Sequence, residues 1–255
     1  MEFADKVALI TGASSGIGRA TALLLAKAGA HLALVSRSRE SLQKVVDEIE
    51  KSDGQHIILP FDVTQVEQCK HAVEQTVERF GKLDILVNAA GIIANGSITT
   101  TTTEAWEIML RLNLTAVFHL MQEATPFLQQ TRGTIVNVSS VTGTRAFPNV
   151  LAYCVSKAGV DQLTRCAALD LAASGVRVNA VNPGVVRTNL HRASGMDEEK
   201  YQTFLAHSQT THPIGRVGTP EEIAEAILFL ASERAGWITG VTFNIDGGRQ
   251  LTCAR

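Results

Sequence analysis

Several features that define other protein classes are scarce in this chain. No apolar run approaches the roughly 20 residues that a membrane-spanning helix needs, so we expect no membrane span. Lys and Arg are dispersed without a basic stripe or tail, and the formal net charge is -2, which argues against nucleic acid as a partner. The four cysteines match neither CxxC nor a zinc spacing, and the seven histidines form no HExxH motif. The sequence therefore predicts no metal site.

We also expect no targeting segment. The first strand-like run starts at Val7, and no charged-then-apolar leader precedes it. The final residues Cys253-Ala254-Arg255 are not a peroxisomal signal. Thiols without a pairing pattern suit a reducing compartment. These absences together predict a cytoplasmic protein.

The composition is that of an ordinary globular protein, with 45% hydrophobic and 19% charged residues. Short runs rich in Val, Ile and Leu alternate with longer amphipathic stretches along the chain. Near-continuous apolarity predicts strands that are buried on both faces, as in a parallel sheet. The expected strands span residues 7–11, 32–36, 57–61, 85–88, 134–138, 176–181 and 241–245. The expected helices span residues 17–28, 40–51, 66–80, 104–130, 152–173 and 220–231.

This alternation predicts an α/β fold of the Rossmann type, a doubly wound parallel sheet of about seven strands with helices on both faces. We expect residues 1–255 to form a single domain that both binds a dinucleotide and catalyses. One stretch breaks the alternation, because residues 187–218 contain no strand-like run. A long excursion inside a compact fold often forms a lid or a binding loop, so this segment should contact the substrate.

A cluster of glycines joins the first expected strand to the first expected helix. The sequence there reads TGASSGIG, at residues 11–18. Glycines at such a turn let the backbone approach a pyrophosphate, and the helix N-terminus offers free N–H groups to its oxygens. The alternative is a tight turn without a ligand, but the position at the start of a βαβ series favours a dinucleotide site. The predicted binding residues are Gly12, Ser14, Ser15, Gly16, Ile17 and Gly18.

The end of the second expected strand bears on which cofactor binds. NAD sites commonly place an Asp or Glu there for the ribose 2′-hydroxyl, whereas this chain has Ser36 and Arg37. A hydroxyl and a guanidinium suit a 2′-phosphate. The plainer alternative is that Arg37 is a solvated loop charge. We therefore favour NADP(H), and NAD(H) stays open.

Two further strand ends carry candidate cofactor residues. Asp62 and Val63 follow the third expected strand. The Asp62 carboxylate either accepts from an adenine amino group or caps the helix expected after Gln65, and both alternatives stay open. The fourth expected strand closes with residues that permit close backbone approach, namely Asn88, Ala89, Ala90 and Gly91.

Two residues that suit proton transfer lie four apart in an expected helix. Tyr153 and Lys157 project from one face of it. Carbonyl reduction needs a proton delivered to the oxygen, and a neighbouring ammonium would lower the pKa of the phenol toward working pH. Alone, such a pair is most often an ordinary helix-face pair. Ser140 strengthens the functional interpretation of this pair, because it ends a strand at the edge where ligands bind in open α/β sheets. Its hydroxyl could hydrogen-bond a substrate oxygen there.

The order and spacing of these motifs resemble the short-chain dehydrogenase/reductase family over nearly the whole chain, from Lys6 to Gly248. The resemblance rests on TGASSGIG at 11–18, Asp62-Val63, NAAG at 88–91, Asn113, NVSS at 137–140, YxxxK at 153–157, PG at 183–184 and the late Asp246-Gly247-Gly248. It implies that Ser140, Tyr153 and Lys157 form a catalytic triad, with Tyr153 as the acid/base. It also implies that Asn113 completes a proton relay through water and Lys157.

The resemblance implies the remaining cofactor contacts as well. Lys157 would bind the nicotinamide ribose, Asp62 and Val63 would hold the adenine, and residues 88–91 would line the cleft. The nicotinamide carboxamide would face Pro183, Gly184, Val186 and Thr188. Ser15 stands where many NADP-using relatives carry a basic residue, which keeps NAD(H) as the alternative cofactor. Because the family is commonly tetrameric or dimeric, we expect a homotetramer or homodimer, with helices 104–130 and 152–173 forming much of one interface.

The substrate side of the expected cleft is largely apolar. Its large apolar side chains are Ile92, Ile93, Val141, Phe147, Leu151, Leu190, Met196, Tyr201 and Phe204. Such a wall suits a partly apolar small-molecule carbonyl or alcohol. A 3-oxoacyl reductase-like activity leads, because residues 215–218 and 246–248 look like those reductases. The alternatives are a hydroxysteroid or retinoid dehydrogenase using NAD(H), and a non-catalytic NADP(H)-sensing protein.

Overall fold

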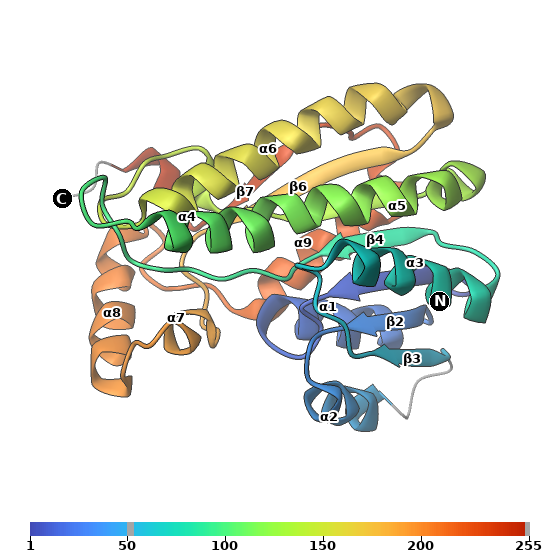
Figure 1. The fold of residues 1–255 in the computed structure, drawn as a ribbon, viewed down its shortest axis with the longest axis horizontal. Helices are drawn as coiled ribbons and strands as arrows, with labels where there is room; N and C mark the ends of the chain where they lie inside the picture. The colour runs from blue at the N-terminus through green and yellow to red at the C-terminus, as the bar shows by residue number, and fades with distance from the viewer. Residues whose placement is uncertain (50–53, 253–255) are drawn as a thin grey trace.

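The computed structural model describes residues 1–49 and 54–252. Its centre is a seven-stranded sheet in the order β3-β2-β1-β4-β5-β6-β7, with every neighbouring pair parallel (Figure 1). The strands are β1 (Val7–Thr11), β2 (His31–Val35), β3 (His56–Leu59), β4 (Ile85–Asn88), β5 (Thr134–Val138), β6 (Arg177–Pro183) and β7 (Thr242–Ile245). The predicted α/β class and parallel sheet are confirmed.

Helices cover both faces of this sheet (Figure 1). They are α1 (Gly16–Lys27), α2 (Arg39–Ile49), α3 (Val66–Phe80), α4 (Thr103–Leu110), α5 (Ala116–Thr131), α6 (Leu151–Leu171), α7 (Leu190–Ala193), α8 (Glu198–Thr211) and α9 (Pro220–Ala231). The side chains of β1 alternate between two cores. Ala8 and Ile10 pack in the core that α1, α2 and α9 share, and Val7 and Leu9 pack in the core of α3, α5 and α6. Burial on both faces explains the near-continuous apolarity of the strands.

The sheet reverses its direction of growth at β1. β2 and β3 extend it on one side of β1, and β4 to β7 extend it on the other. In open parallel sheets, ligands bind beyond the carboxyl ends of the strands at this reversal. The loops that follow β1 and β4 are therefore the ones placed to bind a ligand.

The helix expected over residues 104–130 is divided in the structure. A π-helical turn, Arg111–Thr115, separates α4 from α5. The predicted helical stretch is therefore present in its full length, but it is interrupted by this π turn. The wider turn brings Asn113 to the interior, where it is 0% exposed. The predicted end of the helix from residue 40, at Lys51, lies outside the described residues.

Residues 187–218 form no strand, as the composition suggested, and contain α7 and α8 instead. These helices lie beyond the carboxyl edge of the sheet, on the left of Figure 1. They have a small core of their own around Tyr201, Leu205 and Val217. α9 then begins with a full capping box between Thr219 and Glu222, which anchors the end of this segment.

No helix among the described residues is long and apolar enough to cross a membrane.

Candidate active site

Three loops meet at the carboxyl edge of the sheet. A Cβ atom at Gly12 would lie 2.9 Å from the carbonyl oxygen of Ala89, and one at Gly16 would lie 3.3 Å from Cγ2 of Thr188. The loops after β1, β4 and β6 therefore touch, and the missing side chains of glycine allow the approach. The structure thus brings together the candidate cofactor residues of segments 12–18, 88–91 and 183–188.

Thr11 and the glycines after it shape the first loop. The Thr11 hydroxyl accepts hydrogen bonds from the N–H groups of Ala89 and Ala90, at 3.1 and 3.2 Å. Gly12 and Gly16 have φ values of 65° and 54°, in the region that favours glycine. The N-cap residue of α1 makes no side-chain capping bond, so the first-turn N–H groups stay available at the positive end of the helix. This cradle fits the pyrophosphate of a dinucleotide.

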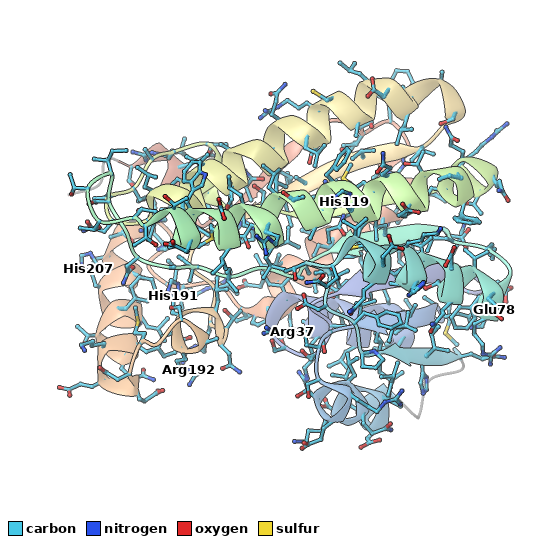
Figure 2. All side chains as sticks on the ribbon, viewed as in Figure 1. Arg37, Glu78, His119, His191, Arg192 and His207 are labelled. Atoms are coloured by element: carbon cyan, nitrogen blue, oxygen red, sulfur yellow. The ribbon has the colours of Figure 1, made fainter. Side chains whose placement is uncertain are left out.

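The carboxyl end of β2 borders the same cradle. The Ala13 N–H donates to the carbonyl oxygen of Val35 at 3.2 Å, which places Ser36 and Arg37 beside the glycine loop. Arg37 is exposed and lies near the middle of the view in Figure 2. Its position suits a phosphate on the ribose of a dinucleotide held by the glycine loop.

Asp62 does not cap the following helix. The N-cap of α3 is Gln65, whereas Oδ1 of Asp62 accepts from the N–H of Thr64 at 2.9 Å in an Asx turn. The helix-cap alternative was therefore wrong. Val63 is buried in the core, and its carbonyl accepts from the Cys69 thiol at 3.1 Å. Its side chain is thus part of the core, so only its backbone can reach an adenine.

Tyr153 and Lys157 lie on a buried face of α6, close to Ser140. Their exposed fractions are 7% and 5%. The Lys157 ammonium donates to the carbonyl oxygen of Val138 at 2.8 Å, and its Nζ lies 5.7 Å from the centre of the Tyr153 ring. A Cβ atom at Gly91 would lie 3.7 Å from the same Nζ. The pair therefore adjoins the loop after β4.

Burial dominates the charge states of this pair. It raises the pKa of Tyr153 to about 12, and the neighbouring Ser140 hydroxyl opposes that change only in part. Burial lowers the pKa of Lys157 to about 8, while the Asp161 carboxylate opposes the change. The expectation that the pKa of the phenol lies near working pH was therefore wrong, because desolvation of the phenolate is the largest effect and raises that pKa. At neutral pH the site holds a phenol beside an ammonium.

Asn113 fixes the chain that follows Gly91. Its side-chain amide donates to the carbonyl of Ile92 and accepts from the N–H of the same residue, both at 2.9 Å. It also donates to the hydroxyl of Ser156 on α6 at 3.1 Å. A Cβ atom at Gly91 would lie 3.3 Å from its Oδ1. Asn113 and Lys157 therefore border the same glycine, as a shared role would require.

Comparison with known proteins identifies the family. A family profile described as Enoyl-(Acyl carrier protein) reductase matches residues 12–250. The chain is 41% identical to a 3-oxoacyl-(acyl-carrier-protein) reductase of Thermotoga maritima, over 97% of this chain and 99% of that protein. The chain belongs to the short-chain dehydrogenase/reductase family. The resemblance drawn from its motifs is thereby confirmed.

Other relatives of this short-chain dehydrogenase/reductase carry different names. It is 40% identical to a cyclohexanol dehydrogenase of an Acinetobacter species, over 96% of this chain and 95% of that protein. Its fold matches a Caenorhabditis elegans short-chain dehydrogenase/reductase crystallised with cofactor, with a TM-score of 0.92 and 38% identity, covering 100% and 98% of the two chains. The protein is thus an oxidoreductase that acts on CH–OH and C=O groups.

Sequence reasoning missed the apolar contacts of the dehydrogenase/reductase around Tyr153. Met109 and Trp106 of α4 pack there together with Ile92 and Ile93. Their spacing of three residues indicates a buried helix face, but it does not say which partner the face covers. The two side chains form part of the small core that packs against Tyr153.

His212 was also missed. Its Nε2 accepts from the N–H of Val185 at 3.1 Å, and its Nδ1 lies 2.5 Å from the carbonyl oxygen of Ser208. Burial lowers the pKa of His212, which keeps the imidazole neutral and lets Nε2 accept. The residue ties the end of α8 to the loop after β6. One histidine outside any motif gave no signal of this in the sequence.

Some side chains expected on the substrate wall belong elsewhere. Tyr201 is 2% exposed and packs inside the α7–α8 segment, where its hydroxyl donates to the carbonyl of Thr188 at 2.9 Å. Its assignment to the wall was wrong, because the pattern could not separate this small core from a cleft. His191 and Arg192 of α7 lie at the lower left of Figure 2.

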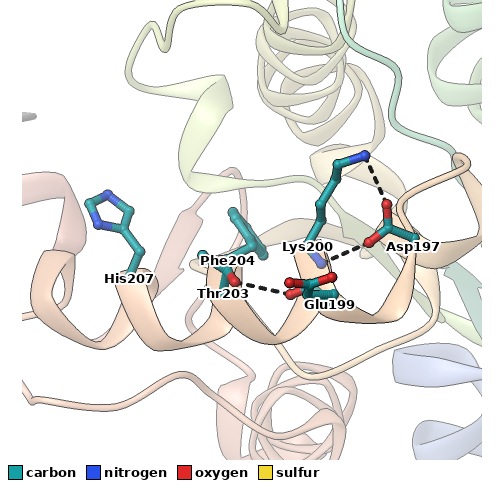
Figure 3. Close-up of a pocket in the computed structure, with 6 residues that line it drawn as sticks. All are labelled: Asp197, Glu199, Lys200, Thr203, Phe204 and His207. Atoms are coloured by element: carbon teal, nitrogen blue, oxygen red, sulfur yellow. Dashed lines mark hydrogen bonds and ion pairs between the residues drawn. The ribbon is translucent and has the colours of Figure 1, made fainter.

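A shallow pocket of about 610 Å³, open to solvent, runs along α8 (Figure 3). Asp197 caps this helix through the N–H of Lys200 and pairs with its ammonium, both at 2.8 Å, as the expected solvated helix start. None of the lining residues is among those around Tyr153, so this pocket is a separate feature of the α7–α8 segment. The residues that line it are Asp197, Glu199, Lys200, Thr203, Phe204 and His207.

Proposed function

We propose that this protein is an NADP(H)-dependent oxidoreductase that moves a hydride between a nicotinamide and a carbonyl or secondary alcohol carbon, with Tyr153 as general acid/base. The observation that carries the proposal is the buried phenol–ammonium pair, Tyr153 and Lys157, beside the point where the cofactor loops meet. The phenol carries a transferable proton, and the ammonium is the cation beside it.

The protein's own residues handle the proton, and a bound nicotinamide supplies or accepts the hydride. The Tyr153 hydroxyl gives its proton to the carbonyl oxygen in reduction and takes one in oxidation. Ser140 orients the same oxygen by a hydrogen bond. Lys157 favours negative charge on the phenol oxygen as the proton leaves. Asn113 completes a proton relay through Lys157, which suits its place beside Gly91.

The loops at the edge of the sheet fit the dinucleotide. The glycine loop and the N-terminus of α1 hold the pyrophosphate, and Ser36 and Arg37 read the 2′-phosphate. Asp62 and the backbone of Val63 hold the adenine. Arg37 supports NADP(H), and Ser15, where a basic residue would strengthen that choice, leaves NAD(H) as the alternative. Residues 183–188 contact the glycine loop through Thr188 and would hold the nicotinamide carboxamide.

The substrate is a partly apolar carbonyl compound or alcohol. A 3-oxoacyl reductase-like activity leads, since a relative 41% identical to the chain bears that name. The cyclohexanol dehydrogenase relative favours small cyclic alcohols as a second candidate. A hydroxysteroid or retinoid dehydrogenase and a non-catalytic sensor remain the alternatives. The buried Tyr153 and Lys157 argue against the sensor, which has no need of them.

The whole chain works as one catalytic unit, and we propose that it assembles as a homotetramer or homodimer. Cys69, Cys154 and Cys166 are free thiols, which suits the reducing cytoplasm. Cys253 lies outside the described residues.

The experiment that tests the proposal is oxidation of NADPH and of NADH against a panel of ketones, 3-oxoacyl thioesters, steroids and retinals. NADPH oxidation with at least one carbonyl class supports the proposal. Calorimetric titration with both nucleotides runs beside it. Binding without turnover of any compound would indicate the sensor, and absence of binding would refute the whole assignment.

A further inference from the structure

Asp161 continues the line of functional side chains along α6. Tyr153, Lys157, Asp161 and Arg165 stand four residues apart in succession, so they follow one face of the helix. Asp161 is only 1% exposed, whereas Arg165 reaches solvent. A buried carboxylate is costly unless cations or hydrogen bonds stabilise it. Its position one turn beyond Lys157 provides such a cation.

The carboxylate also contacts the segment that carries Ser140. The Asn182 side-chain amide donates to Oδ2 of Asp161 at 2.9 Å and to the carbonyl oxygen of Ser140 at 3.0 Å. A Cβ atom at Gly143 would lie 2.5 Å from the same Oδ2. The turn after Ser140 therefore rests directly on Asp161. One carboxylate is thus linked both to the Lys157 helix face and to the Ser140 backbone.

The charges that act on Asp161 come from its own helix. Burial raises the pKa of its carboxyl, while hydrogen bonds from Ser139 and Asn182 and the charges of Arg165 and Lys157 lower it. In return, Asp161 is the only charged group of the described residues that raises the pKa of Lys157.

The elements packed against α6 direct their own charged groups elsewhere. The turn Val141–Gly143 carries none, and Arg177 of β6 donates to the carbonyls of Leu230 and Ser232. On α5, the charge of Glu123 contributes to the raised pKa of Cys69, and the His119 ring packs against the Phe118 ring. The exposed charged residues of α4 and the π turn are Glu104, Glu107 and Arg111.

We propose that Asp161 is a positioning residue of this active site, an inference that rests on the proton-transfer function proposed above. Its negative charge, one helical turn from Lys157, holds that amine in the ammonium form. Its hydrogen bond with Asn182 fixes the backbone of Ser140. Asp161 thereby widens the pH range over which the site holds a phenol beside an ammonium.

The test replaces Asp161 by its neutral isostere. Asp161→Asn keeps the size and one acceptor oxygen for the Asn182 amide and removes the charge. The titration of Lys157 is followed in the cofactor-free protein by NMR of carbon-13-labelled lysine side chains. We expect a midpoint near pH 8 in the wild type. In the variant we expect it to be lower by roughly one pH unit. The pH above which the rate of carbonyl reduction falls should be lower by the same amount.

Two variants serve as controls. Asp170→Asn makes the same charge change on the same helix at an exposed position and should move neither the titration nor the rate profile. Asn182→Ala keeps the Asp161 carboxyl but removes its hydrogen bond from Asn182 together with the bond to Ser140. It should lower kcat and move the Lys157 midpoint less than Asp161→Asn does.

An unchanged Lys157 midpoint in folded Asp161→Asn overturns the proposal even if activity falls, because a purely structural role would reduce activity alone. If the variant does not fold, the carboxyl titration of Asp161 in the wild type decides. A carboxyl ionised at pH 7 supports the proposal, and one protonated there overturns it. Absent turnover in the wild type would refute the proposed function instead, while the Lys157 titration, which needs no cofactor or substrate, would still report on Asp161.

Discussion

At the scale of single side chains, the protonation states of Tyr153 and Lys157 decide whether the site can donate a proton to the substrate or accept one from it. Burial keeps the phenol protonated and makes the amine a weaker base than usual. The sequence identified both residues by spacing and by their place after Ser140. It could not give the balance between desolvation and charge, because that balance depends on the side chains of α4 and of the loop after β4 that pack against Tyr153.

The rate of carbonyl reduction should depend on pH through Lys157. Its pKa is lowered to about 8, so the ammonium is present below that pH and is lost as pH rises through it. Tyr153, with a pKa of about 12, stays protonated over the same range. We expect kcat for reduction to be level near neutral pH and to fall above pH 8. A rate that rises steadily between pH 8 and 10 would contradict this assignment.

Arg37→Ala should weaken NADPH binding much more than NADH binding. A guanidinium bond to a phosphate contributes enough that its loss lowers affinity roughly tenfold to hundredfold. Dissociation constants for both nucleotides, measured by calorimetry, check the change. Arg79→Ala removes an exposed guanidinium from α3 and should leave both constants unchanged. An unaltered NADPH preference in Arg37→Ala would show that Arg37 does not read the phosphate.

Among the elements, the strand-to-helix connections carry the cofactor site. The strands were predictable because their apolarity is nearly continuous, and the glycine loop was predictable because it joins β1 to α1. The π turn was not, since residues 111–115 have no composition that separates a π turn from an α-helix. The turn nevertheless decides that Asn113 faces inward. Side-chain direction at such a turn follows from packing against Ile92 and Ser156 rather than from local sequence.

Gly12→Ala should abolish tight cofactor binding. Its Cβ would meet the Ala89 carbonyl at 2.9 Å, and the left-handed backbone adds a penalty of about 1–2 kcal/mol. Gly81→Ala is the matched control, because Gly81 also has positive φ but its Cβ would have nothing within 4 Å. We expect both variants to lower Tm by a few degrees and only Gly12→Ala to weaken NADPH at least about tenfold. Equal nucleotide affinity in both variants would contradict the proposed cradle.

For the whole molecule, one seven-stranded sheet brings residues far apart in the sequence to a single edge. The sequence predicted the fold class and the order of the motifs. It could not predict that Tyr201 belongs to a separate small core in the α7–α8 segment, because an apolar helix face looks the same against a cleft or a core. α5 and α6 lie side by side on one face of the molecule (Figure 1) and still carry exposed apolar side chains, Phe118 and Val155.

These exposed side chains support the expected assembly. Ile108 on α4 and Leu169 on α6 are exposed as well, at 54% and 80%. Large apolar side chains gathered on neighbouring helices mark interaction surfaces. Sedimentation equilibrium should therefore give the mass of a homotetramer or homodimer, and the double variant Phe118→Asp/Val155→Asp should sediment as a smaller species with its fold intact. A monomeric wild type at micromolar concentration would contradict the assembly.

The central claim is that Tyr153 transfers the proton beside a bound dinucleotide. The most direct test compares turnover and NADPH affinity in the wild type and in Tyr153→Phe, using the carbonyl compound that gives the fastest wild-type rate. Removing the hydroxyl should lower kcat by at least about 10²-fold, because general acid catalysis contributes that much, while the dissociation constant of NADPH stays within about threefold. Equal turnover in the two proteins would contradict the account.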